Sequence, residues 1–235
     1  MRQFIPARVI LFPGLGADAR VFDRMHARLG GDLECPDWLT PQDGESFDAY
    51  AKRWAAILTP MPGDDRPVFL AGVSFGGMVA LRMAPYLKPK AVILIGSCRS
   101  VHAKPRRWVV ADRLGNLIPQ RWLGRRILAG LALWVSLVDR LDTKQRALLM
   151  RMAAESDPMR VRWSARQCAL WDFDPDGFPD FPPVHQIHGK LDAIIPLIDT
   201  RPDVLIPDGR HLIHLSHEQT VCRFLMDVIR RHVRS

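Results

Sequence analysis

The sequence predicts an α/β protein: a mostly parallel, doubly wound sheet with helices on both faces and a helical cap insertion. Short apolar runs alternate along the chain with segments of helical spacing. Each run is continuously apolar, with no in/out alternation, which is typical of strands buried on both faces. One long stretch, 101–166, has helical character throughout. At 235 residues, the chain is long enough for one domain with a sizeable core.

The apolar runs and their boundaries predict six strands. Pro13-Gly14 ends the first run, and Gly96-Ser97 ends the fourth, as expected where a buried strand enters a turn. We expect strands at residues 9–12, 33–37, 67–73, 91–95, 184–188 and 203–206.

Helices are predicted between these strands. Ser46 is a suitable N-cap for a helix whose apolar side chains follow helical spacing. We expect helices at 19–29, 46–58, 75–87 and 218–233, and a helical cap, or lid, at 101–166 interrupted by Pro105, Pro119 and Pro158. The predicted core therefore consists of residues 1–100 and 167–235.

Composition argues against several classes of protein. A hydrophobic fraction of 48% and a charged fraction of 25% are ordinary for a globular protein. The first residues lack the apolar region of a signal peptide, and the longest apolar stretch, 127–138, is too short for a transmembrane segment. The four cysteines form no zinc-ligand pattern. We expect a cytoplasmic protein without a metal site.

The positive charge is concentrated in the predicted cap. Residues 101–166 contain fourteen basic and five acidic side chains, so this segment has a net charge of +9. The rest of the chain has a net charge of −1, which gives the formal net charge of +8 for the whole chain. The charge fits either a solvated helix surface or docking of an anionic partner, such as an acyl-carrier protein, the phosphates of acyl-CoA or an anionic lipid surface. Nucleic acid is not expected, because aromatic residues do not alternate with the basic ones.

A candidate nucleophile lies where the third strand meets a helix. Residues 72–77 read GVSFGG, which is the G-x-S-x-G pattern of a nucleophile elbow. Small residues on both sides of Ser74 permit a sharp turn, and the helix amino terminus favours developing negative charge. The alternative is a glycine-rich turn that serves only strand–helix packing.

Four motifs in order resemble those of the α/β-hydrolase superfamily, and the chain looks like a serine esterase-like member with a helical cap. The elbow is the first motif. The others are similar to the family's oxyanion loop, its acid loop and its histidine loop, and they read Phe12-Pro-Gly-Leu-Gly16, His188-Gly-Lys-Leu-Asp-Ala-Ile-Ile-Pro196 and Asp208-Gly-Arg-His-Leu-Ile-His-Leu215.

This resemblance implies a role for each motif. Ser74 would be the nucleophile, His211 the base and Asp192 the acid that orients the imidazole. The backbone N–H groups of Leu15 and Phe75 would form the oxyanion hole. Neither a metal nor an organic cofactor is implied.

Some assignments have rivals. His214 and His217 compete with His211 as the base, and Asp199 and Asp203 compete less strongly with Asp192 as the acid. The sequence also departs from the family pattern, with Pro13 in place of the usual histidine and with an unrelated loop around Trp38.

Four tryptophans are candidates for the substrate pocket: Trp38, Trp108, Trp122 and Trp134. Those of the cap could equally form the cap's own core. The predicted function is a serine hydrolase that cleaves a carboxylic ester or thioester through an acyl-enzyme. An acyltransferase or lyase with the same triad is the alternative, followed by a non-catalytic protein that binds a small molecule.

Overall fold

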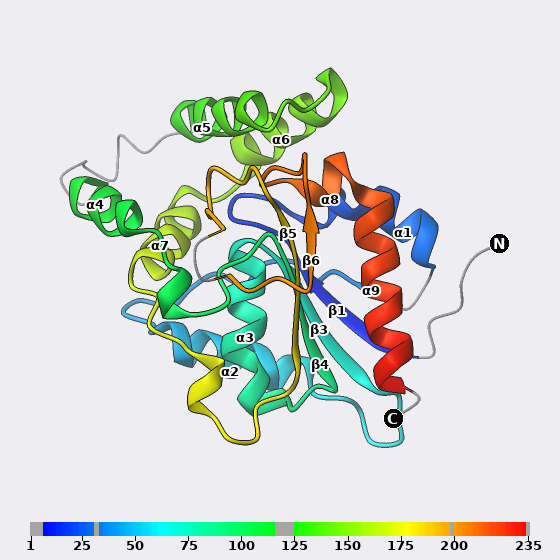
Figure 1. Cartoon of the computed structure of the whole chain (residues 1–235). Coiled ribbons are helices and arrows are strands. Elements are labelled where there is room, and N and C mark those ends of the chain that lie inside the picture. Colours follow the sequence, from blue (N-terminus) through cyan, green and yellow to red (C-terminus); the bar gives the residue numbers. More distant parts are fainter. Residues whose placement is uncertain (1–6, 31–32, 116–124, 198–199, 234–235) are drawn as a thin grey trace.

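A computed structural model describes residues 7–30, 33–115, 125–197 and 200–233 (Figure 1). Within these residues a single sheet has the strand order β2-β1-β3-β4-β5-β6, and all neighbouring strands pair in parallel. The predicted parallel sheet is therefore confirmed. Its strands are β1 (Arg8–Phe12), β2 (Leu33–Glu34), β3 (Val68–Val73), β4 (Ala91–Ile95), β5 (Val184–Gly189) and β6 (Val204–Ile206).

The strand order places several loops at one edge of the sheet. After β1 the chain moves outward to β2 and then crosses back to β3, so the winding direction reverses between β1 and β3. In open α/β sheets, ligands bind outside the carboxyl ends of the strands at such a reversal. The Pro13-Gly14 turn follows β1 and Ser74 follows β3, so both lie at this position.

Helices cover both faces of the sheet, which explains the continuous apolar runs (Figure 1). Val9 and Leu11 of β1 belong to the buried cluster on one face, with side chains of α1 and α9. Ile10 and Phe12, the alternate residues, belong to the cluster on the other face, with α2 and α3. Because a strand directs successive side chains to opposite faces, both sets must be apolar. These helices are α1 (Asp23–Leu29), α2 (Phe47–Leu58), α3 (Phe75–Leu87) and α9 (Glu218–Val233).

Among the described residues, four α-helices lie between β4 and β5: α4 (Arg106–Gly115), α5 (Arg125–Val138), α6 (Thr143–Glu155) and α7 (Pro158–Ala169). Asp142 caps α6 in a reciprocal capping box, and Asp157 with Pro158 begins α7. The indole of Trp163 on α7 donates to the backbone oxygen of Glu45, 3.1 Å away, and so joins α7 to the start of α2. No helix in the described ranges is long and apolar enough to cross a membrane.

The structure corrects several predicted boundaries. The second strand was predicted at 33–37 but ends at Glu34, two residues before Pro36, which has no N–H to donate to a ladder. The first predicted helix begins with a 3-10 turn, Ala19–Phe22, capped by Asp18. A short helix, α8 (Ile213–Ser216), was not predicted, and α7 continues beyond residue 166, where we expected the cap to end.

Two glycines allow three backbone segments to meet. A Cβ atom on Gly76 would lie closer than 3.0 Å to the backbone oxygens of Phe12 and Pro13, and one on Gly72 would lie equally close to the backbone of Gly76. These are backbone contacts that a side-chain rotation cannot relieve. The end of β1, the end of β3 and the start of α3 are therefore in direct contact.

This contact predicts that Gly76→Ala reduces the free energy of unfolding by about 2 kcal/mol or more, because the added methyl group overpacks a rigid site. The matched control is Gly130→Ala in α5, where a Cβ would meet nothing within 4 Å. That change should raise stability by about 0.5–1 kcal/mol, since alanine has the higher helix propensity. Urea unfolding of both variants measures the difference, and equal effects would contradict the interpretation.

Candidate active site

Ser74 has an unusual backbone conformation between β3 and α3. Its φ angle is 51°, in the region that non-glycine residues rarely adopt. Its N–H donates to the backbone oxygen of Ile95 at 3.1 Å. Its own carbonyl accepts from the N–H of Gly77 at 3.0 Å and from the hydroxyl of Ser97 at 2.7 Å. These bonds hold the sharp turn that directs the hydroxyl away from the sheet.

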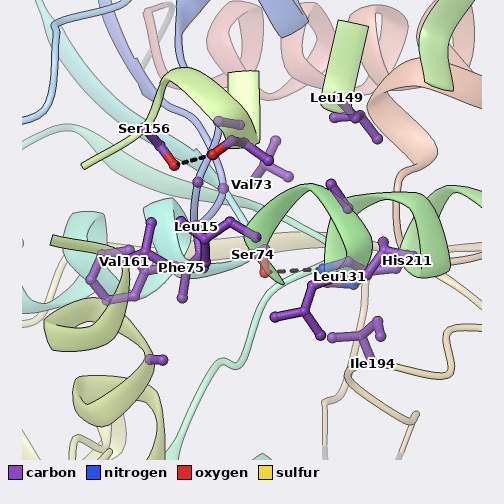
Figure 2. Close-up of a pocket in the computed structure, with 18 of the residues that line it drawn as sticks. Leu15, Val73, Ser74, Phe75, Leu131, Leu149, Ser156, Val161, Ile194 and His211 are labelled. Atoms are coloured by element: carbon purple, nitrogen blue, oxygen red, sulfur yellow. Dashed lines mark hydrogen bonds between the residues drawn. The ribbon is translucent and has the colours of Figure 1, made fainter. Parts of the chain in front are cut away.

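Three side chains from separate strand ends form a hydrogen-bonded series. His211 Nε2 lies 3.0 Å from Ser74 Oγ (Figure 2), and His211 Nδ1 lies 2.8 Å from Asp192 Oδ2. Ser74 follows β3, Asp192 follows β5 and His211 follows β6. Parallel strands bring their carboxyl ends to one edge of the sheet, so residues 137 positions apart can meet there.

The Asp192 carboxylate is completely buried and is oriented by the protein backbone. Its Oδ1 accepts hydrogen bonds from the N–H groups of Ile194 and Ile195, both at 2.8 Å. His188 lies behind it, with Nε2 donating to the carbonyl oxygen of Ile195 at 2.8 Å. His188 is thus a buried and satisfied histidine at the end of β5.

Asp192 and His211 alter each other's pKa. Burial acts to raise the pKa of Asp192, but the charge and hydrogen bond of His211 outweigh it and hold that pKa below its ordinary value. Burial likewise acts to lower the pKa of His211, but the Asp192 carboxylate outweighs it, so the pKa of His211 is raised. The pair therefore favours an imidazolium beside a carboxylate.

The rival residues lie elsewhere. His214 is buried against the ring of Phe22 at a centroid distance of 5.8 Å, and burial lowers its pKa to about 3. His217 pairs with Asp208 at 3.3 Å. Asp203 accepts from the backbone N–H of Gln186 at 2.7 Å, and Asp199 lies outside the described residues. Among the described candidates, Asp192 and His211 are the pair joined to Ser74.

Leu15 and Phe75 both lie beside Ser74 (Figure 2). Phe75 is the first residue of α3, where backbone N–H groups have no partner within the helix. A Cβ on Gly14 would lie 3.7 Å from Ser74 Cβ, so the first loop reaches the serine itself. Leu15, Phe75 and Ser74 therefore all line the same cavity.

Ser74 and His211 open into a cavity of about 500 Å³ (Figure 2). Its lining is mostly apolar, with one side from the core and the other from α4–α7. The helices contribute Trp108, Leu128, Leu131, Ala132, Val135, Leu149, Ala153 and Val161. A cavity of this size and character can hold a small apolar group next to the serine hydroxyl.

Comparison with known proteins identifies the family. The sequence profile of the Alpha/beta hydrolase family matches residues 9–224, which is most of the chain. The chain belongs to the alpha/beta hydrolase family. A search of curated proteins finds no match.

Solved structures show the same fold as this hydrolase-family chain at low sequence identity. A thermophilic esterase from Thermogutta terrifontis has a TM-score of 0.67 at 19% identity, covering 96% of this chain and 90% of its own. A hydrolase from Oleispira antarctica has a TM-score of 0.70 at 13% identity, with coverage of 97% and 93%. A type II thioesterase from the yersiniabactin pathway has a TM-score of 0.58 at 20% identity, with coverage of 99% and 95%.

The predicted pocket tryptophans have different locations in the structure. Trp108 lines the cavity. Trp134 on α5 is 54% exposed and is not among the described residues that line the cavity. Trp38 is not among the described lining residues; it packs on Phe12 and Phe75, and its indole donates to Ala17 in the first loop at 3.0 Å. Trp122 lies outside the described residues.

Sequence reasoning missed residues that support the site from a distance. The Arg107 guanidinium on α4 donates to the carbonyl oxygens of Ala193 and Ile194, next to Asp192. Ser97 holds the carbonyl of Ser74, and Asp139 accepts from the backbone N–H that follows His211. None has a local sequence signal, because each acts on a segment far away in the chain.

The burial of His214 predicts acid sensitivity. Its pKa is about 3 in the folded protein and about 6.5 in an unfolded chain, so below about pH 6.5 the unfolded state binds a proton that the folded state does not. The free energy of unfolding should therefore decrease as the pH is lowered. His214 alone should contribute up to about 1.4 kcal/mol per pH unit to this decrease.

The test compares the unfolding free energy of wild type and His214→Gln between pH 7 and pH 4. The variant should lose less stability over this range, because glutamine does not titrate. Exposed His102 provides the control, and His102→Gln should follow wild type. Identical slopes for wild type and His214→Gln would show that His214 is protonated in the folded state.

Proposed function

We propose that this protein is a serine hydrolase that cleaves a carboxylic ester or thioester through an acyl-enzyme on Ser74. One observation carries the proposal: the hydrogen-bonded series from Asp192 through His211 to Ser74 ends at an apolar cavity. A serine hydroxyl needs a base within hydrogen-bond reach to become nucleophilic, and His211 Nε2 is within that reach.

The proposed reaction has two halves. Ser74 Oγ attacks the carbonyl carbon while His211 Nε2 accepts the hydroxyl proton, and the oxyanion is bound by the backbone N–H groups of Leu15 and Phe75. The tetrahedral intermediate then expels the alcohol or thiol, which takes the proton from His211. Water, deprotonated by His211, attacks the acyl-enzyme in the same way and releases the acid. Asp192 stabilises the imidazolium in both halves.

The cavity supports an apolar acyl group as the bound part of the substrate. Its walls from α5, α6 and α7 are mostly aliphatic or small, as at Leu131, Leu149 and Val161 (Figure 2), with Arg162 of α7 as a charged lining residue. In this proposal, residues 101–166 act as the cap that covers the acyl group. A thermophilic esterase and a type II thioesterase share the fold, which agrees with either an ester or a thioester as the bond cleaved.

Docking of an anionic carrier on the cap remains a prediction from charge alone. Part of the positive charge is already used inside the protein, since Lys104 donates to the carbonyl oxygen of Trp171 at 2.7 Å and Arg107 contacts the Asp192 loop. Several other basic residues are exposed and could meet a carrier: Arg106, Arg113, Arg140, Lys144 and Arg166.

We predict that Ser74→Ala abolishes labelling by a fluorophosphonate probe and lowers kcat/KM on short p-nitrophenyl esters by about 1000-fold or more, because it removes the nucleophile. Ser216→Ala is the matched control. That serine also contacts an imidazole, with its Oγ 2.9 Å from His217 Nδ1, but it is not among the described residues of the cavity.

Full activity of Ser74→Ala would refute the assignment. A ligand that raises the Tm of wild type but is never consumed would instead indicate a binding protein. An acyltransferase would transfer the acyl group to an added alcohol, and product analysis detects that outcome.

We also predict that Val161→Phe shortens the preferred acyl chain, because the larger side chain fills part of the cavity. kcat/KM for the longest accepted acyl ester should fall about tenfold or more, while that for the acetyl ester changes little. Val110→Phe is the control, since Val110 is 56% exposed on α4. An unchanged chain-length profile would show that the acyl group does not bind at Val161.

A further inference from the structure

Asp139 is a buried carboxylate next to the candidate active site. It follows α5 directly and is only 5% exposed. Its Oδ2 accepts a hydrogen bond from the backbone N–H of Leu212, the residue after His211. Its Oδ1 is buried and has no hydrogen-bond partner in the described part of the chain. A buried carboxylate with a free oxygen is costly unless a positive charge forms nearby.

The segment that carries Asp139 is firmly attached to the histidine loop. Gln145, on α6, donates from Nε2 to the carbonyl oxygen of Leu215 at 2.9 Å. Leu141 is buried in the core cluster that also includes Ile213. Asp139 of the connection and Gln145 of α6 are therefore hydrogen-bonded to two residues on the C-terminal side of His211, Leu212 and Leu215.

Charged and titratable groups from several elements surround His211. Asp192 and neutral His188 come from the end of β5, His214 from α8, Ser74 from the elbow and Asp139 from the α5–α6 connection. Of these groups, the two carboxylates favour a protonated His211 imidazole. Burial lowers the pKa of His188 and of His214, and the charge of His211 lowers both further.

The electrostatic effects agree with this geometry. Burial raises the pKa of Asp139, and the nearby Asp192 adds to the rise. The backbone amides of Leu212 and His211 and the charge of His211 oppose it. In return, after burial and Asp192, the Asp139 carboxylate contributes to the raised pKa of His211. The interaction thus operates in both directions.

We propose that Asp139 is a positioning residue that holds the His211 loop through Leu212 and supplies a second negative charge to the imidazolium formed during turnover. This inference rests on the proposed function, because it assigns Asp139 a part in the same proton transfer. The cap, through Asp139, would then contribute to the chemistry as well as to the acyl pocket.

Asp139→Asn separates the charge from the hydrogen bond. The asparagine carbonyl can still accept from Leu212, so the loop should keep its position, but the negative charge is gone. The pKa of His211 should fall, which moves the acidic limb of the kcat/KM profile to lower pH by about half a unit or more. At neutral pH, kcat on a p-nitrophenyl ester should fall about tenfold with little change in KM.

Asp142→Asn is the matched control. Asp142 lies on the same connection as Asp139, and its exposed carboxylate caps the start of α6. Asparagine is an equally good N-cap residue. Its pH profile and Tm should match those of wild type. If Asp139→Asn does not fold, Asp139→Ser provides the same test with a neutral acceptor.

A second readout does not depend on turnover. NMR titration of the His211 ring, identified by the loss of its signal in His211→Gln, should show a lower pKa in Asp139→Asn than in wild type. An unchanged ring titration and an unchanged kcat in a folded variant would overturn the proposal. Failure of wild type to react with fluorophosphonate would instead overturn the proposed function, while the NMR titration would still test the coupling.

Discussion

The close contact between the backbones at Gly72, Gly76 and the Phe12–Pro13 turn is the constraint on which the site depends. It brings the loop after β1 beside the turn after β3, so that Leu15 and Phe75 both lie next to Ser74. It also leaves Ser74 in a backbone conformation that needs the surrounding hydrogen bonds to persist. A side chain at either glycine would separate these segments.

Burial then decides which ionisable groups can take part in chemistry. A buried imidazole is disfavoured in its charged form unless a carboxylate accompanies it. His211 has Asp192 as its partner, so its pKa is raised, whereas His214 has no carboxylate partner among the described residues and its pKa is lowered to about 3. The pKa values of two histidines only three residues apart are thus shifted in opposite directions.

The helices between β4 and β5 line the cavity and also form hydrogen bonds to the loops that carry Asp192 and His211. Arg107 contacts the loop of Asp192, and Asp139 and Gln145 contact the loop of His211. Both loops that present the imidazole and its carboxylate are therefore held from the same helical segment. Movement of these helices would alter the geometry around His211 as well as the volume of the cavity.

Local patterns in the sequence predicted the parallel sheet, the elbow at Ser74 and the residues that the structure brings together with it, because strand burial and tight turns leave such patterns. The folded structure was needed to show that Trp38 donates a hydrogen bond to the first loop, that Trp134 is exposed and that Asp139 accepts a hydrogen bond from Leu212. These contacts and exposures depend on how segments that are distant in the sequence pack together. A local sequence pattern contains no information about which distant segment a side chain will contact.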